Sequence, residues 1–311
     1  LKAWSGGPGL YELVNDLKNT DPGLKTLLSF GGWTFGTKLF KAMGKTSATR
    51  ATFINSAIAF VREHGFDGID IDWEYPLADD KSSYAALIKE LRAACDAEAS
   101  STGRARLLIT AAVTAAKSKI EAGYDVPAMA KNMDFIMLMS YDFHGAWDTK
   151  TGFNSPLHSR SDESADEQTW NTVEHFDILT LSLYFSEYGA NFWASQGMSR
   201  TQIAIGIAPY GRGWTLADSS NTAVGAPGAG PAKKLDYTRE AGIASYFEMQ
   251  FVKENAFAGA FIWTLDFDDF NDKSCSEGKY PLLTTIQKEL GGGTVDPVAS
   301  FLIAFRNFDN L

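Results

Sequence analysis

Acidic side chains occupy every second position of one short segment. The run Asp67-Gly68-Ile69-Asp70-Ile71-Asp72-Trp73-Glu74 separates Asp70, Asp72 and Glu74 by two residues each. On a β-strand such residues share one face, about 6.6 Å apart. Carboxyl groups gathered on a buried face disfavour one another's ionisation, so at least one of them retains a proton. Apolar residues on the opposite face argue against the alternative, a solvated edge strand, and the row predicts acid catalysis.

The strand that carries this row is one of several short apolar segments. These segments alternate with stretches whose apolar residues follow helical spacing. Alternation of this kind predicts a parallel sheet wrapped by helices, either a (β/α) barrel or a doubly wound sheet. The predicted strands are residues 24–30, 68–73, 107–113, 135–139, 203–208 and 259–265.

Glycine-rich or polar loops are predicted after nearly every strand. Both candidate architectures place their chemistry at the carboxyl ends of the strands, where these loops lie. The stretch 223–232, rich in Gly and Pro, is interpreted as a flexible excursion within one of them. The predicted loops are residues 31–36, 75–81, 142–155, 210–230 and 266–279.

Composition excludes several classes of function. The chain has 311 residues with 28 Lys plus Arg against 38 Asp plus Glu, a net charge of −10 that is unlike the basic footprint of a nucleic-acid-binding protein. No apolar run is long enough for a membrane helix, so we expect no membrane partner. Cys95 and Cys275 lack the spacing of a metal site or a disulfide framework. We expect Cys95 on the buried side of a helix. The first residue, Leu1, is followed by no apolar leader, so we expect any export signal to have been removed or never to have existed.

Two motifs carry a resemblance to a known family. Ser29-Phe30-Gly31-Gly32-Trp33 resembles the Ser-x-Gly-Gly motif, and residues 67–74 resemble the Asp-x-x-Asp-x-Asp-x-Glu motif, of glycoside hydrolase family 18, the chitinases and chitinase-like lectins. Residues 137–147, 206–213 and 261–269 look like later strands of the same family. The resemblance runs from about residue 10 to about residue 291. It implies a TIM (β/α)8 barrel over residues 1–291. The remaining C-terminal tail, 292–311, is apolar enough that we expect it to pack on the barrel.

The resemblance also implies catalytic roles. Glu74 would be the general acid that protonates the leaving oxygen and then the base that activates water. In this family the nucleophile is the acetamido oxygen of the substrate itself. Asp72 would bind the acetamido N–H and share a proton with Asp70. Tyr141 would hold the acetamido oxygen, with Asp142 assisting in the same subsite.

Aromatic residues after the strands are the expected sugar-binding surface. Trp263 resembles the floor of the subsite for the cleaved sugar, and Trp33 and Trp147 match aromatic positions along the groove. Met139 and Tyr75 are the other expected substrate-binding residues. His144 is interpreted as a hydrogen-bonding residue of its loop.

The chain also departs from the family pattern. Two barrel strands expected at the start are not recognisable, and the small α+β insertion expected within residues 237–259 is mostly absent, which predicts a shallower groove. Cys275 resembles a position that pairs with a cysteine of that insertion, but no partner is present near Met249. Because an open parallel sheet leaves backbone groups unpaired, we expect residues 298–308 or 176–183 to pair with an open edge or to cover it.

Three functions remain open on these residues. The first is an endo-acting chitinase with chitin or chito-oligosaccharides as its partner. The second is a catalytically weak or inactive chitin-binding lectin or matrix protein, against which the presence of Glu74 argues. The third is an endoglycosidase of N-glycan cores, for which the three tryptophans are less suited than for a linear polymer. The resemblance implies no metal or organic cofactor, a monomer and secretion.

Overall fold

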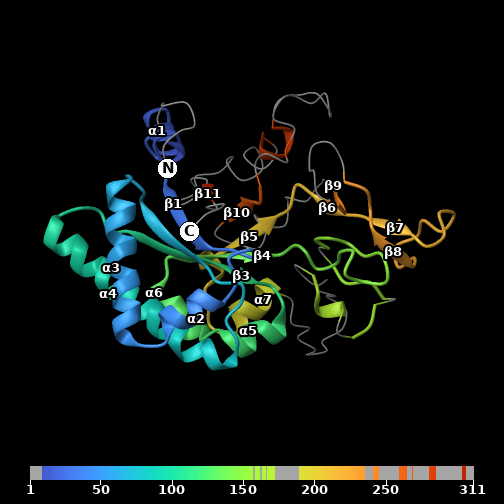
Figure 1. The fold of residues 1–311 in the computed structure, drawn as a ribbon, viewed down its shortest axis with the longest axis horizontal. Helices are drawn as coiled ribbons and strands as arrows, with labels where there is room; N and C mark the ends of the chain where they lie inside the picture. Colours follow the sequence, from blue (N-terminus) through green and yellow to red (C-terminus); the bar gives the residue numbers. More distant parts are fainter. Residues whose placement is uncertain are drawn as a thin grey trace, which may run out of the picture.

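The computed structural model of the chain is built around one parallel sheet. Among the residues that the structure describes, this sheet has seven strands in the order β10-β5-β4-β3-β2-β1-β11 (Figure 1). The described residues are 9–156, 158–161, 163–165, 167–171, 189–234, 241–244, 259–264, 268, 280–284 and 303–305. The sheet strands are β1 (Thr26–Gly31), β2 (Gly68–Asp72), β3 (Leu108–Thr114), β4 (Phe135–Met139), β5 (Ile203–Ile207), β10 (Gly259–Ile262) and β11 (Ile303–Phe305).

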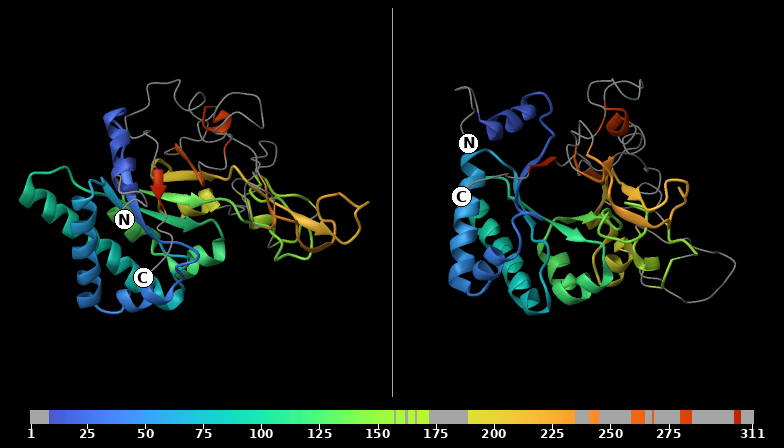
Figure 2. Two further views of the ribbon diagram at one scale, coloured as in Figure 1. Left: turned by 45° about the horizontal axis from the view of Figure 1, so that its top comes forward. Right: turned by 45° about the vertical axis from the view of Figure 1, so that its right-hand side comes forward.

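Helices α2 to α7 gather on one side of the sheet in both views of Figure 2, whereas α1, which precedes β1, lies apart from them. The helices are α1 (Leu10–Asp16), α2 (Lys38–Gly44), α3 (Ser47–Glu63), α4 (Lys81–Thr102), α5 (Lys117–Gly123), α6 (Val126–Asn132) and α7 (Gly189–Ser195). Short 3₁₀ turns cover Leu17–Asn19, Ala78–Asp80, Glu167–Thr169 and Arg200–Gln202. Helix α3 begins after Thr46, whose hydroxyl accepts a hydrogen bond from the backbone N–H of Thr49 at 3.1 Å. Helix α4 ends at Gly103, which adopts φ +68°.

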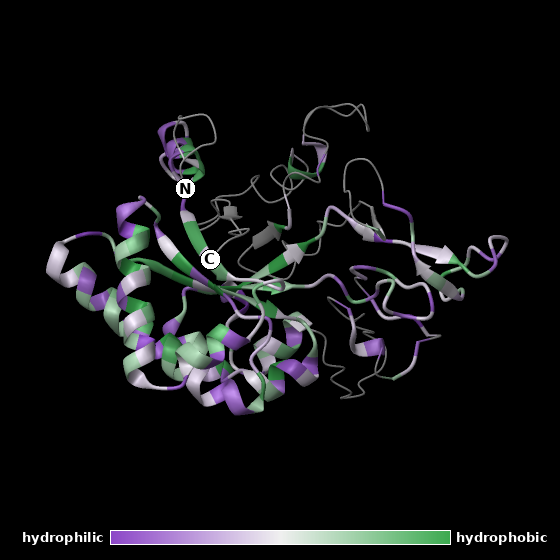
Figure 3. Ribbon diagram, viewed as in Figure 1, coloured by the Kyte–Doolittle hydropathy of each residue, from purple (hydrophilic) through white to green (hydrophobic). Residues whose placement is uncertain are grey.

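The hydrophobic core lies between the sheet and these helices. Ile69 and Ile71 of β2 are fully buried there, and Trp73 is 1% exposed. The ring of Trp73 stacks on Phe40 of α2, with 5.0 Å between centroids. Figure 3 shows the apolar colour concentrated on the central strands, whereas the helices mix polar and apolar residues. The side chains on the opposite face of the sheet point away from the helices, and the candidate site lies on that face.

Register across the first three strands aligns polar residues in one row. Ser29 of β1 stands beside Asp70 of β2, which in turn stands beside Thr110 of β3. Because alternate residues of neighbouring parallel strands face the same way, all three side chains project away from the helices. The register thus places two hydroxyl groups on either side of one carboxyl group.

The sequence-predicted strands are confirmed, each shifted by a few residues at most. The interpretation of residues 210–230 as a loop is wrong. That stretch contains β6 (Gly211–Arg212), which pairs with β9 (Ile243–Ala244), and β7 (Trp214–Leu216), which pairs with β8 (Gly228–Pro231). The β7–β8 hairpin projects from the body in Figure 1 and in the left view of Figure 2. Its pairing is supported by residues distant in sequence, such as the bridge from Lys150 to Pro227, so local composition does not reveal it.

The strand β11 lies within the predicted tail. It pairs in parallel with β1, with Thr26 beside Ile303 and Leu28 beside Phe305. The expectation that residues 298–308 pair with an open edge is therefore confirmed for its central residues. Within the described part of the chain, the sheet remains open between β10 and β11. The domain boundary near residue 291 stays a prediction.

Several expectations fall outside the described residues. They concern the segment 176–183, Cys275, most of 237–259 and all of 266–279 except Asp268. Cys95 is described, and it is buried as a free thiol. Among the described residues, no helix is long and apolar enough to cross a membrane.

Candidate functional site

Asp70 is the buried centre of the acidic row. It is 1% exposed and accepts hydrogen bonds from two hydroxyl groups, that of Ser29 at 2.6 Å and that of Thr110 at 2.7 Å. Burial raises the pKa of Asp70 to about 6, and the two hydroxyl donors partly oppose this rise. The side chain therefore changes its protonation state within the range in which many enzymes work.

The Ser-x-Gly-Gly segment brings the end of β1 against the end of β2. Gly31 adopts φ +122°, and a Cβ atom there would stand only 2.1 Å from the carbonyl oxygen of Asp72. The backbone N–H of Gly32 donates to that same oxygen at 2.7 Å. Only glycine allows this approach, because any side chain at residue 31 would collide with the backbone of β2. The motif thus fixes the backbone from which Asp72 projects.

Glu74 and Tyr75 follow directly after β2. The buried ring of Trp73 anchors this exit on the helix side of the sheet, so Glu74 continues the alternation that Asp70 and Asp72 begin. Burial raises the pKa of Tyr75 well above its ordinary value, and the charges of Glu74 and Asp72 raise it further. The hydroxyl group of Tyr75 also hydrogen-bonds Glu74. Tyr75 is therefore a neutral neighbour of the carboxyl group of Glu74.

Tyr141 and Asp142 come from the end of β4. Burial raises the pKa of Tyr141 well above its ordinary value, with smaller contributions from Tyr210 and from the charges of Asp72 and Asp142. The phenol therefore stays protonated and can donate a hydrogen bond. These electrostatic contributions also show that the fold brings Tyr141 close to the acidic row of β2.

Asp142 is held by Tyr210, which follows β5, and by Arg212 of β6. Its Oδ1 accepts hydrogen bonds from the hydroxyl of Tyr210 at 2.9 Å and from Nε of Arg212 at 2.8 Å, and Nη2 of Arg212 lies 2.7 Å away. Its backbone adopts φ +58°, which is uncommon for a residue with a side chain. Asn154 stabilises this turn, since its Oδ1 accepts from the N–H of Asp142 at 3.1 Å and its amide donates to the carbonyl of Tyr210 at 2.6 Å.

The sequence did not predict that Tyr210 and Arg212 belong to the candidate site. Tyr210 and Arg212 lie within a stretch that resembled the family, but nothing local indicates that they meet Asp142. The only available signal was their position after β5, the strand that neighbours β4 in the sheet. His144, by contrast, was correctly interpreted as a loop residue, because its Nδ1 lies 3.1 Å from Oδ2 of Asp148.

The predicted aromatic residues stand around this group. Trp147 is 59% exposed and faces the guanidinium of Arg212, 5.0 Å from its ring centroid. Gly145 makes room for it, since a Cβ atom there would lie 2.3 Å from the indole. Trp263 follows β10 and, with Tyr141, packs on the buried pair Ala208 and Tyr210.

The remaining predicted residues lie on either side of the sheet's end. Trp33 follows β1 and is 69% exposed, so its ring is available for stacking. Met139 is the last residue of β4, half-buried, with Thr114 of β3 as its neighbour in register. The structure therefore connects Tyr75, Tyr141, Asp142, Trp147 and Trp263 with the acidic row or with its supports. Trp33 is not among the residues that these contacts connect to the acidic row.

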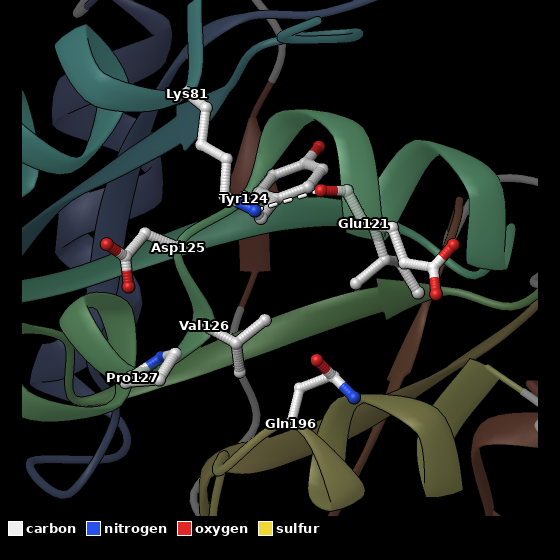
Figure 4. A pocket seen from close by; sticks show the side chains of 8 residues that line it. Lys81, Glu121, Tyr124, Asp125, Val126, Pro127 and Gln196 are labelled. Atoms are coloured by element: carbon white, nitrogen blue, oxygen red, sulfur yellow. Dashed lines mark hydrogen bonds between the residues drawn. The ribbon is translucent and has the colours of Figure 1, made fainter. Parts of the chain in front are cut away.

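A surface cavity of about 330 Å³ opens beside α5. It is bordered by Lys81, Ile120, Glu121, Tyr124, Asp125, Val126, Pro127 and Gln196 (Figure 4). These residues belong to the helix side of the sheet, and none of them is a predicted site residue. Within the described ranges, no cluster of His, Cys, Asp or Glu side chains is arranged to hold a metal ion.

Comparison with known proteins agrees with this geometry. The family model "Glycosyl hydrolases family 18" matches residues 2–250. A "Probable endochitinase" of Caenorhabditis elegans is 46% identical over 93% of this chain and 51% of its own length, so the chain spans about half of that relative. The structure of an "immunomodulatory active chitinase" from Trichuris suis is 40% identical with a TM-score of 0.85, covering 93% of this chain and 86% of that one.

A third similar structure differs in its described activity. Human YKL-39 is described as "a pseudo-chitinase with retained chitooligosaccharide binding properties"; it is 34% identical with a TM-score of 0.82, covering 91% of this chain and 85% of that one. Active and inactive proteins thus share this fold. The match over most of the chain, with the parallel sheet and the acidic strand, shows that the chain belongs to glycosyl hydrolase family 18 and has its (β/α)-barrel architecture.

Proposed function

We propose that this chain hydrolyses β-1,4 linkages between N-acetylglucosamine units of chitin by a retaining, substrate-assisted mechanism. The observation that carries the proposal is the row Asp70, Asp72 and Glu74 at the end of β2, with the Tyr141–Asp142 turn brought beside it. This arrangement offers a proton donor, an anion and a phenol donor to one sugar unit.

Glu74 acts first as a general acid. Its proton passes to the glycosidic oxygen as the bond between that oxygen and the anomeric carbon breaks, while the acetamido oxygen of the same sugar forms a new bond to that carbon. Asp72 accepts a hydrogen bond from the acetamido N–H and stabilises the positive charge of the oxazolinium intermediate. Tyr141 donates to the acetamido oxygen and orients it for attack.

Water completes the reaction from the face that the leaving group occupied. The carboxylate of Glu74 takes a proton from the water, whose oxygen attacks the anomeric carbon as the acetamido oxygen departs. Two inversions give net retention. Asp70 exchanges a proton with Asp72 during the cycle, and its pKa of about 6 suits that exchange near neutral pH.

Exposed aromatic rings support a linear polymer as the substrate. Trp33 and Trp147 are 69% and 59% exposed, and such rings stack on the apolar faces of sugars. Together with Trp263, Met139 and Tyr75 they make a surface on which an internal part of a chain can lie, which favours endo-acting cleavage. Chitin is an extracellular polymer, so the proposal also places the protein outside the cell.

The inactive lectin is the second candidate, and the likeness to YKL-39 favours it. A substitution of one residue, Glu74, distinguishes the enzyme from the lectin. If the chain is an enzyme, Glu74→Gln keeps binding of a short chito-oligosaccharide but lowers hydrolysis by about 10²-fold to 10⁴-fold, because only the proton transfer is lost.

The test measures binding by calorimetry and products by NMR in the wild type and in Glu74→Gln. Fresh products of the wild type should be the β-anomer. Initial α-anomer rules out the acetamido mechanism, and wild-type binding without hydrolysis assigns the chain to the lectins. Near-native turnover in Glu74→Gln contradicts the role given to Glu74.

A further inference from the structure

Helix α5 is fastened to the loop that carries the general acid. Its last residue, Gly123, lies so close to Pro76 that a Cβ atom would stand 2.0 Å from the carbonyl oxygen of Pro76. Nζ of Lys81 also donates to the carbonyl of Glu121 at 2.9 Å, as Figure 4 shows. The position of α5 relative to residues 74–76 is therefore set by close backbone packing from one side and a hydrogen bond from the other.

Lys119 lies one turn before Gly123 on this helix. The neighbouring Ile120 is 1% exposed and fixes which face of α5 turns toward the sheet. The ammonium group of Lys119 stands 4.2 Å from the centroid of the Tyr75 ring. A cation at this distance over an aromatic face is attracted by the ring. Lys119 thus holds the residue that follows Glu74 and that hydrogen-bonds its carboxyl group.

Charge gives Lys119 a second link to Glu74. Partial burial lowers the pKa of Lys119, and the carboxylate of Glu74 raises it. The attraction is mutual, so the ammonium also favours the ionised form of Glu74. Besides Lys119, the titratable groups that interact with Glu74 are Tyr75 after β2 and Tyr124 after α5, and the charges of Asp72 and Asp142 act on Tyr75 as well. Arg212 is paired with Asp142.

We propose that Lys119 is a positioning residue of this site, whose ammonium fixes the ring of Tyr75 and places a positive charge beside the carboxyl group of Glu74. This inference rests on the proposed function and adds to it a residue outside the acidic motif. Asp72 is the neighbouring acid on the same face, and its negative charge opposes ionisation of Glu74. Lys119 offsets this charge and makes Glu74 a stronger acid.

The consequence is a defined shift of the pH profile. Activity falls at high pH when the general acid loses its proton, so the alkaline limb of kcat/KM reports Glu74. Removing the positive charge in Lys119→Gln makes ionisation of Glu74 less favourable, and the limb moves to higher pH by roughly 0.3–0.7 of a unit. A purely structural loss would lower activity equally at every pH.

The experiment compares three variants in the full chain. Lys119→Gln removes the charge, Lys119→Arg retains it, and Lys117→Gln makes the same charge change on the same helix, where the ammonium faces Phe192 at 5.5 Å instead. The limb should move upward in Lys119→Gln and stay in place in the other two. An equal shift in Lys117→Gln, or no shift in Lys119→Gln, overturns the proposal.

A second measurement separates this inference from the proposed function. The pKa of Glu74 can be followed by NMR of its labelled carboxyl carbon, assigned by loss of the signal in Glu74→Gln. This titration does not need catalysis. If the wild type hydrolyses nothing, the proposed function fails, whereas a higher pKa of Glu74 in Lys119→Gln still supports the inference. An unchanged pKa overturns it, whatever the activity.

Discussion

Asp70 in β2 and Asp142 beyond β4 belong to the same site, but the fold surrounds them differently. Asp70 is 1% exposed, and among the described residues its carboxyl group receives hydrogen bonds from the neutral hydroxyls of Ser29 and Thr110 alone. Asp142 has a side chain that is 37% exposed and pairs with the guanidinium of Arg212. One aspartate lies in the sheet and the other in a turn. The partners of Asp70 cannot neutralise a charge, whereas the partner of Asp142 carries the opposite one.

In the proposed mechanism, this difference gives the candidate site both a proton-exchanging group and an anion held in a fixed position. Burial without a cation makes the ionised form of Asp70 unfavourable, so its proton is available for exchange. A charge-assisted pair holds the Asp142 carboxylate in one geometry, which suits orientation of Tyr141 and the substrate. The two regions therefore contribute acid–base behaviour and position, respectively.

The largest effect is expected from Asp70→Asn on stability. The raised pKa means that the folded state binds the proton more tightly than the unfolded chain does. Stability is therefore fully present below the ordinary value of 3.8 and is lost as pH rises through about 6. The cost of the charge at pH 8 is about 3 kcal/mol at most, from a rise of about two units. Asp70→Asn removes it and should raise Tm at pH 8 but change it little at pH 4, in thermal melts at both values.

Asp134→Asn is the matched control for that comparison. Asp134 is half-buried beside two arginines, and its carboxylate accepts hydrogen bonds from Arg92 at 2.6 Å and from Arg106 at 3.0 Å. Its amide variant loses these pairs and should lower Tm at pH 8. The same sign in both variants, or a pH-independent gain in Asp70→Asn, would contradict the distinction drawn between uncompensated and paired aspartates.

Next in size is the loss of the Arg212 pair. Arg212→Met removes the hydrogen bond from the guanidinium to Oδ1 of Asp142 but keeps the one from Tyr210. It also removes the cation beside Trp147. We expect kcat/KM to fall about tenfold, since one charge-assisted bond contributes about 1.5–3 kcal/mol and Tyr210 remains. Arg212→Lys keeps the charge but not the planar geometry and should recover part of the loss. Steady-state kinetics at one pH is sufficient, and unaltered kinetics in Arg212→Met would show that Asp142 needs no such support.

A smaller effect is expected from the hydroxyl donors of Asp70. Thr110→Val keeps the shape of the side chain but removes one donor, so the pKa of Asp70 should rise further. The acidic limb of the activity profile should move up by less than one pH unit. Thr26→Val is the control, because Thr26 is fully buried on the neighbouring strand but its hydroxyl contacts Asn15 instead. A shift of equal size in Thr26→Val would assign the effect to packing.

The smallest effect separates two exposed tryptophans. Trp33→Ala should raise KM about threefold through lost stacking alone, which is worth under about 1 kcal/mol at an exposed ring. Trp147→Ala removes similar stacking and also frees Arg212, so kcat should fall as well. The measurement is kcat and KM for a soluble chito-oligosaccharide. Identical changes in both variants would mean that Trp147 does not position Arg212.

Much of the candidate site could be predicted because its acidic residues follow a local period-two pattern in the sequence. The alternation of Asp70, Asp72 and Glu74 needs only a strand, and the apolar residues between them already require burial on the opposite face. The glycines at 31 and 32 were recognised by resemblance, and the structure supplies their reason, the close approach of the Asp72 carbonyl. The strands of the sheet other than β11 were predicted from short apolar runs that alternate with stretches of helical spacing.

Other features depend on contacts between residues far apart in the chain. The β7–β8 hairpin was predicted as a loop, since β7 has only three residues and β8, with the sequence Gly-Ala-Gly-Pro, lacks a strand-like pattern. The bonds from Arg212 to Asp142 span 70 residues, and no local rule brings those two together. Likewise, no sequence pattern indicates a role for Lys119. Packing of α5 on Pro76 places its ammonium group over the ring of Tyr75.

The amino-acid sequence alone was sufficient for the identity of the acidic strand, for the parallel α/β class and for the aromatic residues beyond the strands, because period-two and helical patterns reflect which face of each element is buried. Strand order and register required the folded chain. They place Ser29 and Thr110 on either side of Asp70, and they set Arg212 against Asp142. The physical reason is that a pKa or a charge pair depends on atoms within a few ångströms in space, whereas periodicity records only neighbours along the chain.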